Sequence, residues 1–183
     1  MCKVSVRAAN GFADVKETDY YYEATLWGSA NNIVRGFSAD EFAPNVPCTR
    51  AQIVTFLYRL AGSPEVSGSC KFADVTDKNY IDAIIWAAEE GVTKGTTATT
   101  FSPNATCTRA QAVTFLHRYN MDTPKAATAH SFTDVTNTGA FYYDAVMWAA
   151  DNGVTLGFAD GSFRPGAVCT RAEIVTFIYR AAA

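Results

Sequence analysis

Three arginines occupy matching places along the chain, and their placement raises a question of charge. The surrounding stretches read CTRAQIVTFLYR at 48–59, CTRAQAVTFLHR at 107–118 and CTRAEIVTFIYR at 169–180. Each stretch predicts the start of a helix, which puts Arg50, Arg109 and Arg171 in a first turn. The helix dipole opposes a cation there by about 0.3–1 kcal/mol. We therefore expect something negative close to each arginine.

Two partners for these arginines fit the sequence, which leaves both open. One is an aspartate of the protein, because the motif F-[AT]-D-V recurs with Asp14, Asp74 and Asp134. A bidentate ion pair between arginine and aspartate would tie two parts of the fold together. The other is an external carboxylate or phosphate, because free N–H groups at a helix start and a planar guanidinium both favour anions. The two combine where the aspartate orients the arginine towards a ligand.

The helix that begins at each arginine carries a detailed start signal. A threonine precedes the arginine, and Gln52, Gln111 or Glu173 follows at the spacing of a capping box. The cysteine before the threonine fits a hydrophobic staple with Ile53 and Ile174 in the first and third copies. The body of this helix is apolar nearly all round, so we expect it at the centre of the molecule.

A second helix is predicted earlier in each copy. It carries a tryptophan, which is Trp27, Trp86 or Trp148. The tryptophan shares a helical face with alanines, which is typical of a core residue. A partly exposed tryptophan is also a platform for a sugar ring, and both interpretations stay open. Gly91 and Gly153 stand where a left-handed cap would end this helix, and Asn32 takes that place in the first copy.

The chain consists of three tandem copies of one sequence repeat. We expect repeats at 11–61, 70–119 and 130–181, separated by the stretches 62–69 and 121–129. Both separators have the composition of loops and are short. Neighbouring repeats are therefore expected to pack into one compact module.

Composition and charge exclude some classes of function. The chain has 183 residues and a formal net charge of −3, which argues against general nucleic-acid binding. It has no apolar run that would span a bilayer, and its first residues lack the apolar region of a signal peptide. If the protein is exported, this chain is expected to be a fragment of a longer precursor.

The five cysteines do not form a disulfide pattern. Cys48, Cys107 and Cys169 hold the same place in each copy, which predicts small buried residues rather than disulfide partners or zinc ligands. Cys2 and Cys70 are left over, and their pairing stays open.

One known family has the same order of motifs. F-x-D-V, a tryptophan helix, a glycine, F-x-P and T-R-A-Q/E follow one another three times between Phe12 and Arg180. This order resembles the S-layer homology (SLH) repeat. The resemblance implies an all-α fold with three repeats around a pseudo-threefold axis and the T-R-A helices in a central three-helix bundle. It also implies a non-catalytic, extracellular module that anchors proteins to secondary cell-wall polysaccharide, bound in grooves between repeats.

The resemblance also implies roles for individual residues. In many members the glycan carries a pyruvate ketal, a carboxylate that the three arginines would bind. The aspartates would accept sugar hydroxyls or orient the arginines, and the tryptophans would stack on rings. The remaining candidates are three loop glycines that admit a close glycan and two basic residues: Gly36, Gly95, Gly157, Arg35 and Lys94.

The copies differ from one another at the candidate site. Gln52 and Gln111 replace the usual glutamate, and Leu156 removes the basic residue from the third copy. Thr96 stands where the other copies have Phe37 and Phe158. We therefore expect unequal grooves, of which one or two do not bind.

Two other functions compete with glycan binding. In a purely structural or protein–protein assembly module, every arginine would be paired internally. A glycosidase would need two carboxylates facing one bond, but no second acid recurs in all three copies. The favoured interpretation has cell-wall polysaccharide and fused cargo domains as partners, with no nucleic acid, membrane insertion, metal or cofactor.

Overall fold

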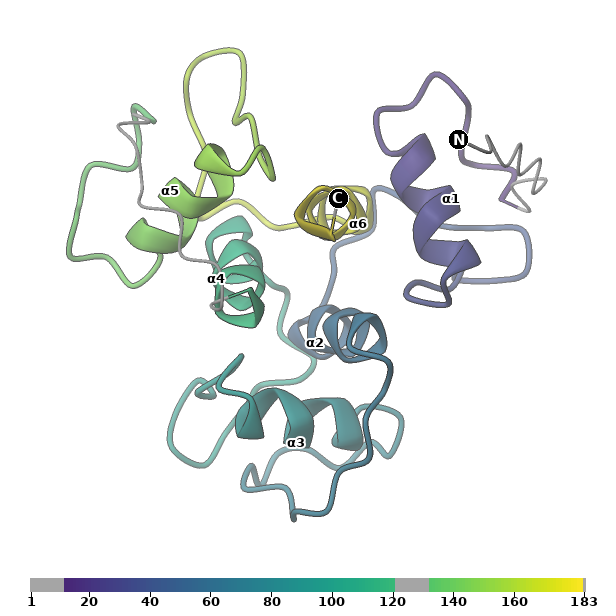
Figure 1. Cartoon of the computed structure of the whole chain (residues 1–183), viewed down its shortest axis with the longest axis vertical. Helices are drawn as coiled ribbons and strands as arrows, with labels where there is room; N and C mark the ends of the chain where they lie inside the picture. Colours follow the sequence, from purple (N-terminus) through teal and green to yellow (C-terminus); the bar gives the residue numbers. More distant parts are fainter. Residues whose placement is uncertain (1–11, 121–131, 183) are drawn as a thin grey trace, which may run out of the picture.

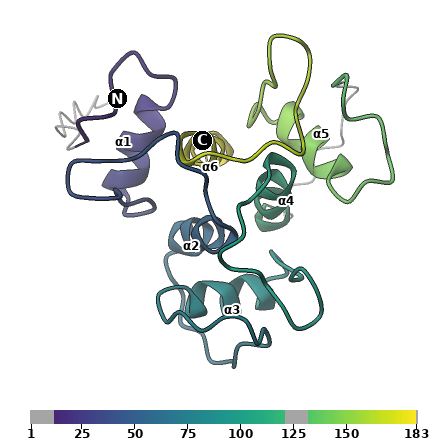
Figure 2. The ribbon, with the colours of Figure 1, turned by 180° about the vertical axis from the view of Figure 1, so that it is seen from behind.

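The computed structural model describes residues 12–120 and 132–182, which form six helices and no strand. In chain order these are α1 Tyr22–Ala30, α2 Arg50–Leu60, α3 Ile81–Glu89, α4 Arg109–Tyr119, α5 Tyr143–Asp151 and α6 Arg171–Ala182. Figure 1 shows α2, α4 and α6 around a common axis with α1, α3 and α5 outside them, and Figure 2 shows this arrangement from behind. The predicted all-α fold around a central three-helix bundle is confirmed.

Each central helix begins at the predicted capping box. In α2 the Thr49 hydroxyl accepts a hydrogen bond from the Gln52 N–H at 3.3 Å, and the Gln52 side-chain oxygen accepts one from the Thr49 N–H at 2.9 Å. The same reciprocal pair forms at α4 and α6. The outer helices are followed by Asn32, Gly91 and Gly153 in the left-handed conformation, as predicted.

The three cysteines before the caps close a ring of backbone hydrogen bonds. The Cys48 N–H donates to the Cys169 carbonyl at 2.9 Å, the Cys107 N–H to Cys48 at 2.8 Å, and the Cys169 N–H to Cys107 at 2.8 Å. Their thiols are free and fully buried, and burial raises the pKa of Cys48 and Cys107 to about 12. The prediction of small buried residues is confirmed. Cys70 is also free, whereas Cys2 lies outside the described residues.

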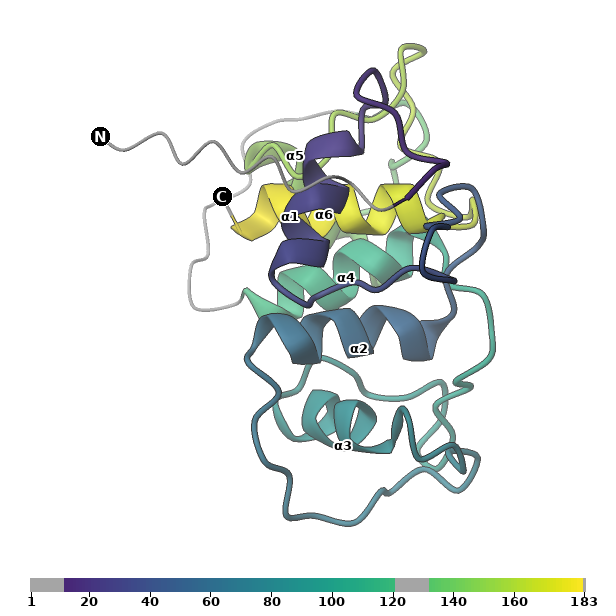
Figure 3. The same ribbon diagram turned by 90° about the vertical axis from the view of Figure 1, so that its right-hand side faces the viewer.

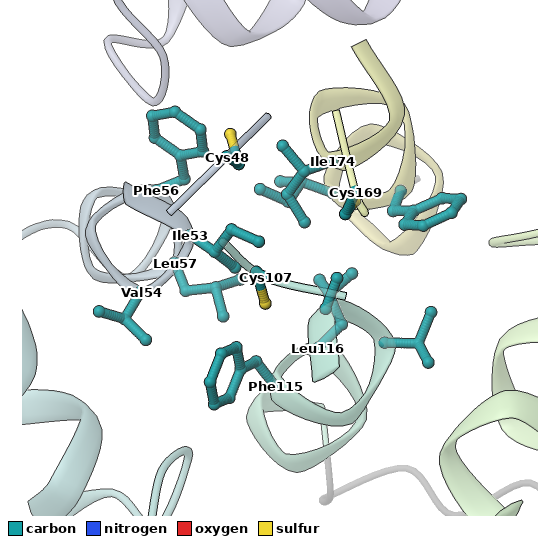
Figure 4. Close-up of a cluster of buried hydrophobic side chains, with 14 of the residues drawn as sticks. Cys48, Ile53, Val54, Phe56, Leu57, Cys107, Phe115, Leu116, Cys169 and Ile174 are labelled. Atoms are coloured by element: carbon teal, nitrogen blue, oxygen red, sulfur yellow. The ribbon is translucent and has the colours of Figure 1, made fainter. Parts of the chain in front are cut away.

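The central helices lie side by side along their length (Figure 3) and supply the core. Their apolar side chains meet on the axis, where Ile53, Leu116 and Ile174 are fully buried (Figure 4). Burying side chains of this kind stabilises the fold by about 1.5–3 kcal/mol each. Within the described ranges, every helix is too short or too polar to cross a membrane.

Each outer helix packs against the central helix of the preceding repeat, not of its own. The pairs are α3 on α2, α5 on α4 and, closing the circle, α1 on α6. The tryptophans lie in these contacts: Trp86 contacts Tyr58 with a ring separation of 5.7 Å, and Trp148 contacts His117 at 5.3 Å. The repeats are therefore interlocked, and the predicted repeat boundaries do not separate packing units.

Candidate functional site

The helix N–H groups beside the arginines are already occupied. The Arg50 N–H donates to the Ala105 carbonyl at 3.0 Å, and the Ala51 N–H donates to the Pro103 carbonyl at 3.1 Å. The same two bonds join α4 to the third repeat and α6 to the first. The expectation of free helix-start donors is therefore wrong, because a loop of the next repeat fills that place. Any anion site must depend on side chains.

The arginines and aspartates bond to the same phenylalanine residue and not to each other. The Phe101 N–H donates to Asp74 Oδ1 at 2.8 Å, and the Phe101 carbonyl accepts from Arg50 Nε at 2.9 Å. Phe163 lies in the same way between Asp134 and Arg109. The third equivalent set is Phe42 with Asp14 and Arg171. The ion-pair interpretation of the arginines and these aspartates is thus not what the described residues show.

Each aspartate fixes a loop of its own repeat. Both Asp74 oxygens accept backbone bonds, from Phe101 and from Ser102 at 2.7 Å. Burial works in the opposite direction, but these donors outweigh it and lower the pKa of Asp74. With both oxygens engaged in this way, the three aspartates hold the loop that the arginines also bind.

A groove of about 370 Å³ opens beside Arg50 and spans all three repeats. Arg50 comes from the first repeat, Lys94 and Arg118 from the second, and the exposed ring of Phe141 from the third. We call this the Arg50 groove. Its full lining is Arg50, Thr93, Lys94, Gly95, Thr96, Gln111, Thr114, Phe115, Arg118 and Phe141. The described lining thus contains three cations and no carboxylate.

The Arg50 guanidinium is buried but not neutralised. Its Nε donates a hydrogen bond to the Phe101 carbonyl. Its Cζ lies 4.8 Å from the centre of the Phe101 ring and 5.2 Å from that of Phe115. Nη1 and Nη2 have no acceptor among the residues that the structure describes. Burial lowers the pKa of Arg50, and it also lowers the pKa of Arg118. The groove therefore holds desolvated positive charge with free donors, which favours an anion.

The equivalent place in the third repeat, the Arg109 corner, is filled by the protein itself. Arg109 Nη1 forms an ion pair with Glu173 Oε1 at 2.6 Å. The Phe158 ring centre lies 4.8 Å from Arg109 Cζ, and Arg164 Cζ lies 3.8 Å from the centre of the same ring. Leu156 is exposed where Lys94 stands in the Arg50 groove. The Arg109 corner therefore has its own counter-ion and its own cover.

The Arg171 corner is intermediate. Arg171 Nη2 donates to the Arg35 carbonyl at 2.7 Å, and Nε donates to Phe42. Nη1 has no acceptor in the described part of the chain. The exposed ring of Phe37 lies 5.9 Å from the guanidinium. Among the described residues Arg171 forms no ion pair, but one of its terminal nitrogens is already used by a backbone carbonyl.

The structure separates the predicted site residues into two groups. It brings Arg50, Lys94 and Gly95 together in one groove. It buries the rings of Trp86 and Trp148 to 5% exposure, so these act as core residues and present no face to a sugar. Trp27 is half-buried against Tyr179 at 5.4 Å, which makes it part of the same kind of helix contact.

The loop glycines have a structural reason of their own. A Cβ on Gly95 would lie 2.5 Å from the Phe72 ring, and its φ is +84°. Gly36 and Gly157 meet the matching rings of Phe12 and Phe132. The phenylalanine ring and nearby backbone carbonyls therefore both require glycine at these positions, and Gly95 additionally lines the Arg50 groove.

Sequence reasoning missed Arg118, Gln111 and Phe141. Gln111 was expected only as part of a capping box. Phe141 is an exposed aromatic ring at the groove, whereas the sequence offered only the tryptophans as possible aromatic platforms. The available signal was an aromatic pair before the outer helix, Tyr20–Tyr21 and Phe141–Tyr142, whose first ring is exposed in both repeats.

Comparison with known proteins agrees with this architecture. The S-layer homology domain model matches residues 11–54, 71–113 and 131–175. A surface-layer 125 kDa protein of Lysinibacillus sphaericus is 38% identical over 128 residues, covering 62% of this chain and 10% of the relative. An endoglucanase of Bacillus sp. is 30% identical over 88% of the chain and 18% of the relative. A cellulosome-anchoring protein of Acetivibrio thermocellus is 27% identical over 80% and 34%.

These matches define a class of repeat modules that occur within longer proteins. The chain spans only a minor part of the length of each relative. The chain belongs to the S-layer homology family and contains three tandem domains. Such domains occur in S-layer and cell-surface proteins that anchor to the cell wall, and the domain itself is non-catalytic. The cell surface is accordingly the location indicated for this chain.

Proposed function

We propose that this chain anchors a larger cell-surface protein by binding an anionic cell-wall polysaccharide, and that the Arg50 groove is its principal binding site. One observation carries the proposal: the two free terminal nitrogens of Arg50 face a groove that contains Lys94 and Arg118 and no described carboxylate. A guanidinium fork binds a carboxylate through two parallel hydrogen bonds. Burial from water makes such a contact stronger than the same contact on an open surface.

The rest of the groove fits a sugar. Phe141 offers an exposed ring at the rim, and rings of this kind pack on the apolar face of a pyranose. Thr96 is exposed at the groove and supplies a hydroxyl that can donate to or accept from a sugar hydroxyl. The ligand class that meets both requirements is a hexose that carries a carboxylate, for which a pyruvate ketal substituent is the candidate. Relatives named for cell-surface and anchoring roles support the same function.

The decisive experiment compares two preparations of cell-wall sacculi. The chain is expected to bind sacculi that keep their polysaccharide, and it is not expected to bind sacculi from which the polysaccharide has been removed. Arg50→Met keeps the length of the side chain and removes the fork, and should weaken binding by about tenfold to a hundredfold, as for the loss of charge-assisted hydrogen bonds. Arg109→Met is the matched control at the same motif position, and it should leave binding unchanged.

Equal binding to both sacculi would contradict the proposal and favour the alternative of a structural or assembly module. Equal loss of binding in the two arginine variants would keep the glycan ligand but remove the assignment to the Arg50 groove.

A further inference from the structure

The third residue of each central helix has two terminal side-chain atoms, and the helix cap uses one of them. In α6, Glu173 Oε2 accepts the Thr170 N–H at 2.9 Å. Glu173 Oε1 is then aimed at Arg109 and accepts from its Nη1 at 2.6 Å. The cap therefore fixes the direction in which the second atom points, which is towards the arginine of the preceding repeat.

Gln111 has the same capping contact and a different second atom. Its Oε1 accepts the Thr108 N–H at 3.1 Å, and Gln111 lines the Arg50 groove. By the geometry of Glu173, the second atom, Nε2, is the one directed towards Arg50. Nε2 is a donor, as are Nη1 and Nη2 of Arg50, so the two side chains cannot satisfy each other. Neither has an acceptor in the ranges that the structure describes. Two sets of converging donors need an acceptor from outside the chain, and a carboxylate accepts from both.

We propose that Glu173 is a built-in counter-ion that closes the Arg109 corner to anionic sugars, and that Gln111 leaves the Arg50 groove open. This inference rests on the proposed function, because it explains why the Arg109 corner stays closed while the two places that have glutamine at the matching position, Gln111 and Gln52, lack this counter-ion. Glu173 Oε1 takes the position that a ligand carboxylate oxygen would take beside Arg50. The choice between glutamate and glutamine at this capping position therefore decides whether a corner carries its own counter-ion, while both residues preserve the cap.

A second layer covers the Arg109 corner. Phe158 lies over Arg109 at 4.8 Å, and Arg164 lies over Phe158 at 3.8 Å. Arg164 in turn donates to Asp160 at 3.0 Å. In the second repeat Thr96 takes the place of Phe158 and bonds only within its loop, to Thr100 and Ser102. Opening the Arg109 corner thus requires loss of the counter-ion first and of the Phe158 ring second.

The test titrates three proteins with a methyl hexoside that carries a pyruvate ketal, and with the methyl ester of that ketal as the uncharged control. The proteins are wild type, Glu173→Gln with Phe158→Thr, and Gln111→Glu. Every new residue is the one that another repeat has at the same place, so the caps and loops are expected to fold. Side-chain Nε–H signals of Arg50 and Arg109 in NMR spectra report each corner separately.

In wild type the acid should shift the Arg50 signal and leave Arg109 in place. In the Glu173→Gln, Phe158→Thr variant the Arg109 signal should also shift, and one more ketal should bind per chain. In Gln111→Glu the affinity at Arg50 should fall by about tenfold or more, because the new carboxylate competes as an internal ligand. The ester should move neither signal.

The outcomes separate this inference from the function on which it rests. If Arg50 responds and Arg109 stays silent in the double variant, the counter-ion role is overturned and the proposed function stands. If Gln111→Glu binds as wild type does, the counter-ion role is likewise overturned. If Arg50 is silent in wild type while Arg109 responds in the double variant, the counter-ion role stands and the assignment of the principal groove fails. Silence at both arginines in all three proteins overturns both.

Discussion

The Arg50 groove and the Arg109 corner are built from the same motif, but only the arginine of the Arg109 corner is paired with a carboxylate of the protein. Both arginines donate from Nε to a phenylalanine carbonyl of the next repeat, at 2.9 and 2.8 Å. Arg50 then has free donors beside Lys94, whereas Arg109 is paired with Glu173. The shared contact shows that each arginine first serves the fold by joining two repeats. The difference shows that binding depends on what surrounds the remaining nitrogens.

The largest expected difference between the Arg50 groove and the Arg109 corner is in how much the loss of the arginine lowers the free energy of unfolding. Arg109→Ala leaves the half-buried Glu173 carboxylate without its partner and should lower the free energy of unfolding by about 3 kcal/mol. Arg50→Ala removes one hydrogen bond and ring contacts but strands no carboxylate, so it should cost roughly 1–2 kcal/mol. Urea denaturation of the two variants measures both values. Equal losses would mean that the Arg109 ion pair contributes nothing beyond the shared contact.

A smaller effect is expected from the basic residue at the rim. Lys94→Leu gives the Arg50 groove the residue that the third repeat has at this place, Leu156. We expect the affinity for the ketal to fall by about fivefold and to depend less on salt, because one exposed cation near an anion is worth about 1 kcal/mol. Calorimetric titration at two salt concentrations measures the change. Lys78→Leu, at an exposed lysine outside the groove, is the control and should bind as wild type does.

The smallest effect concerns pH and the cover of the Arg109 corner. The Ser162 hydroxyl and then Arg164 lower the pKa of Asp160 to about 2. A folded-state pKa below the usual value near 3.9 means that the contact stabilises the loop above that value and is lost as the pH falls through about 2. The Arg164 Nε–H signal should therefore move with the Asp160 carboxyl signal in that window. In Asp160→Asn the Arg164 signal should show no such step; a step that persists would assign the titration to another group.

Much of the fold could be predicted because its signals are local. The capping box of Thr49 and Gln52, and the left-handed positions at Gly91 and Gly153, each depend on a few neighbouring residues. The apolar body of the central helices likewise predicts their place on the axis. These elements keep the same conformation in every repeat, and three copies of a pattern make it easier to recognise.

The contacts between repeats could not be predicted in the same way. Arg50 and Phe101 are separated by 51 residues, and nothing in either stretch identifies the other as its partner. The sequence left open an ion pair between the recurring arginines and aspartates, but Arg50 and Asp74 both bond to Phe101 and not to each other. The sequence does show glutamine at two of the capping positions, Gln52 and Gln111, and glutamate at the third, Glu173. The effect of this difference on the charge beside the arginine depends on the cap, because the cap determines which side-chain atom is directed towards the arginine.

The interlocking of the helices also governs how the module can be transplanted. Because α1 rests on α6, a cut at either separator would not release an intact piece. A fragment that stops after the second repeat would keep α1 and lose the surface that shelters it, and its Trp27 ring would be left beside water instead of Tyr179. Anyone who grafts this anchor onto another protein must therefore move the three repeats together, as a single indivisible cassette.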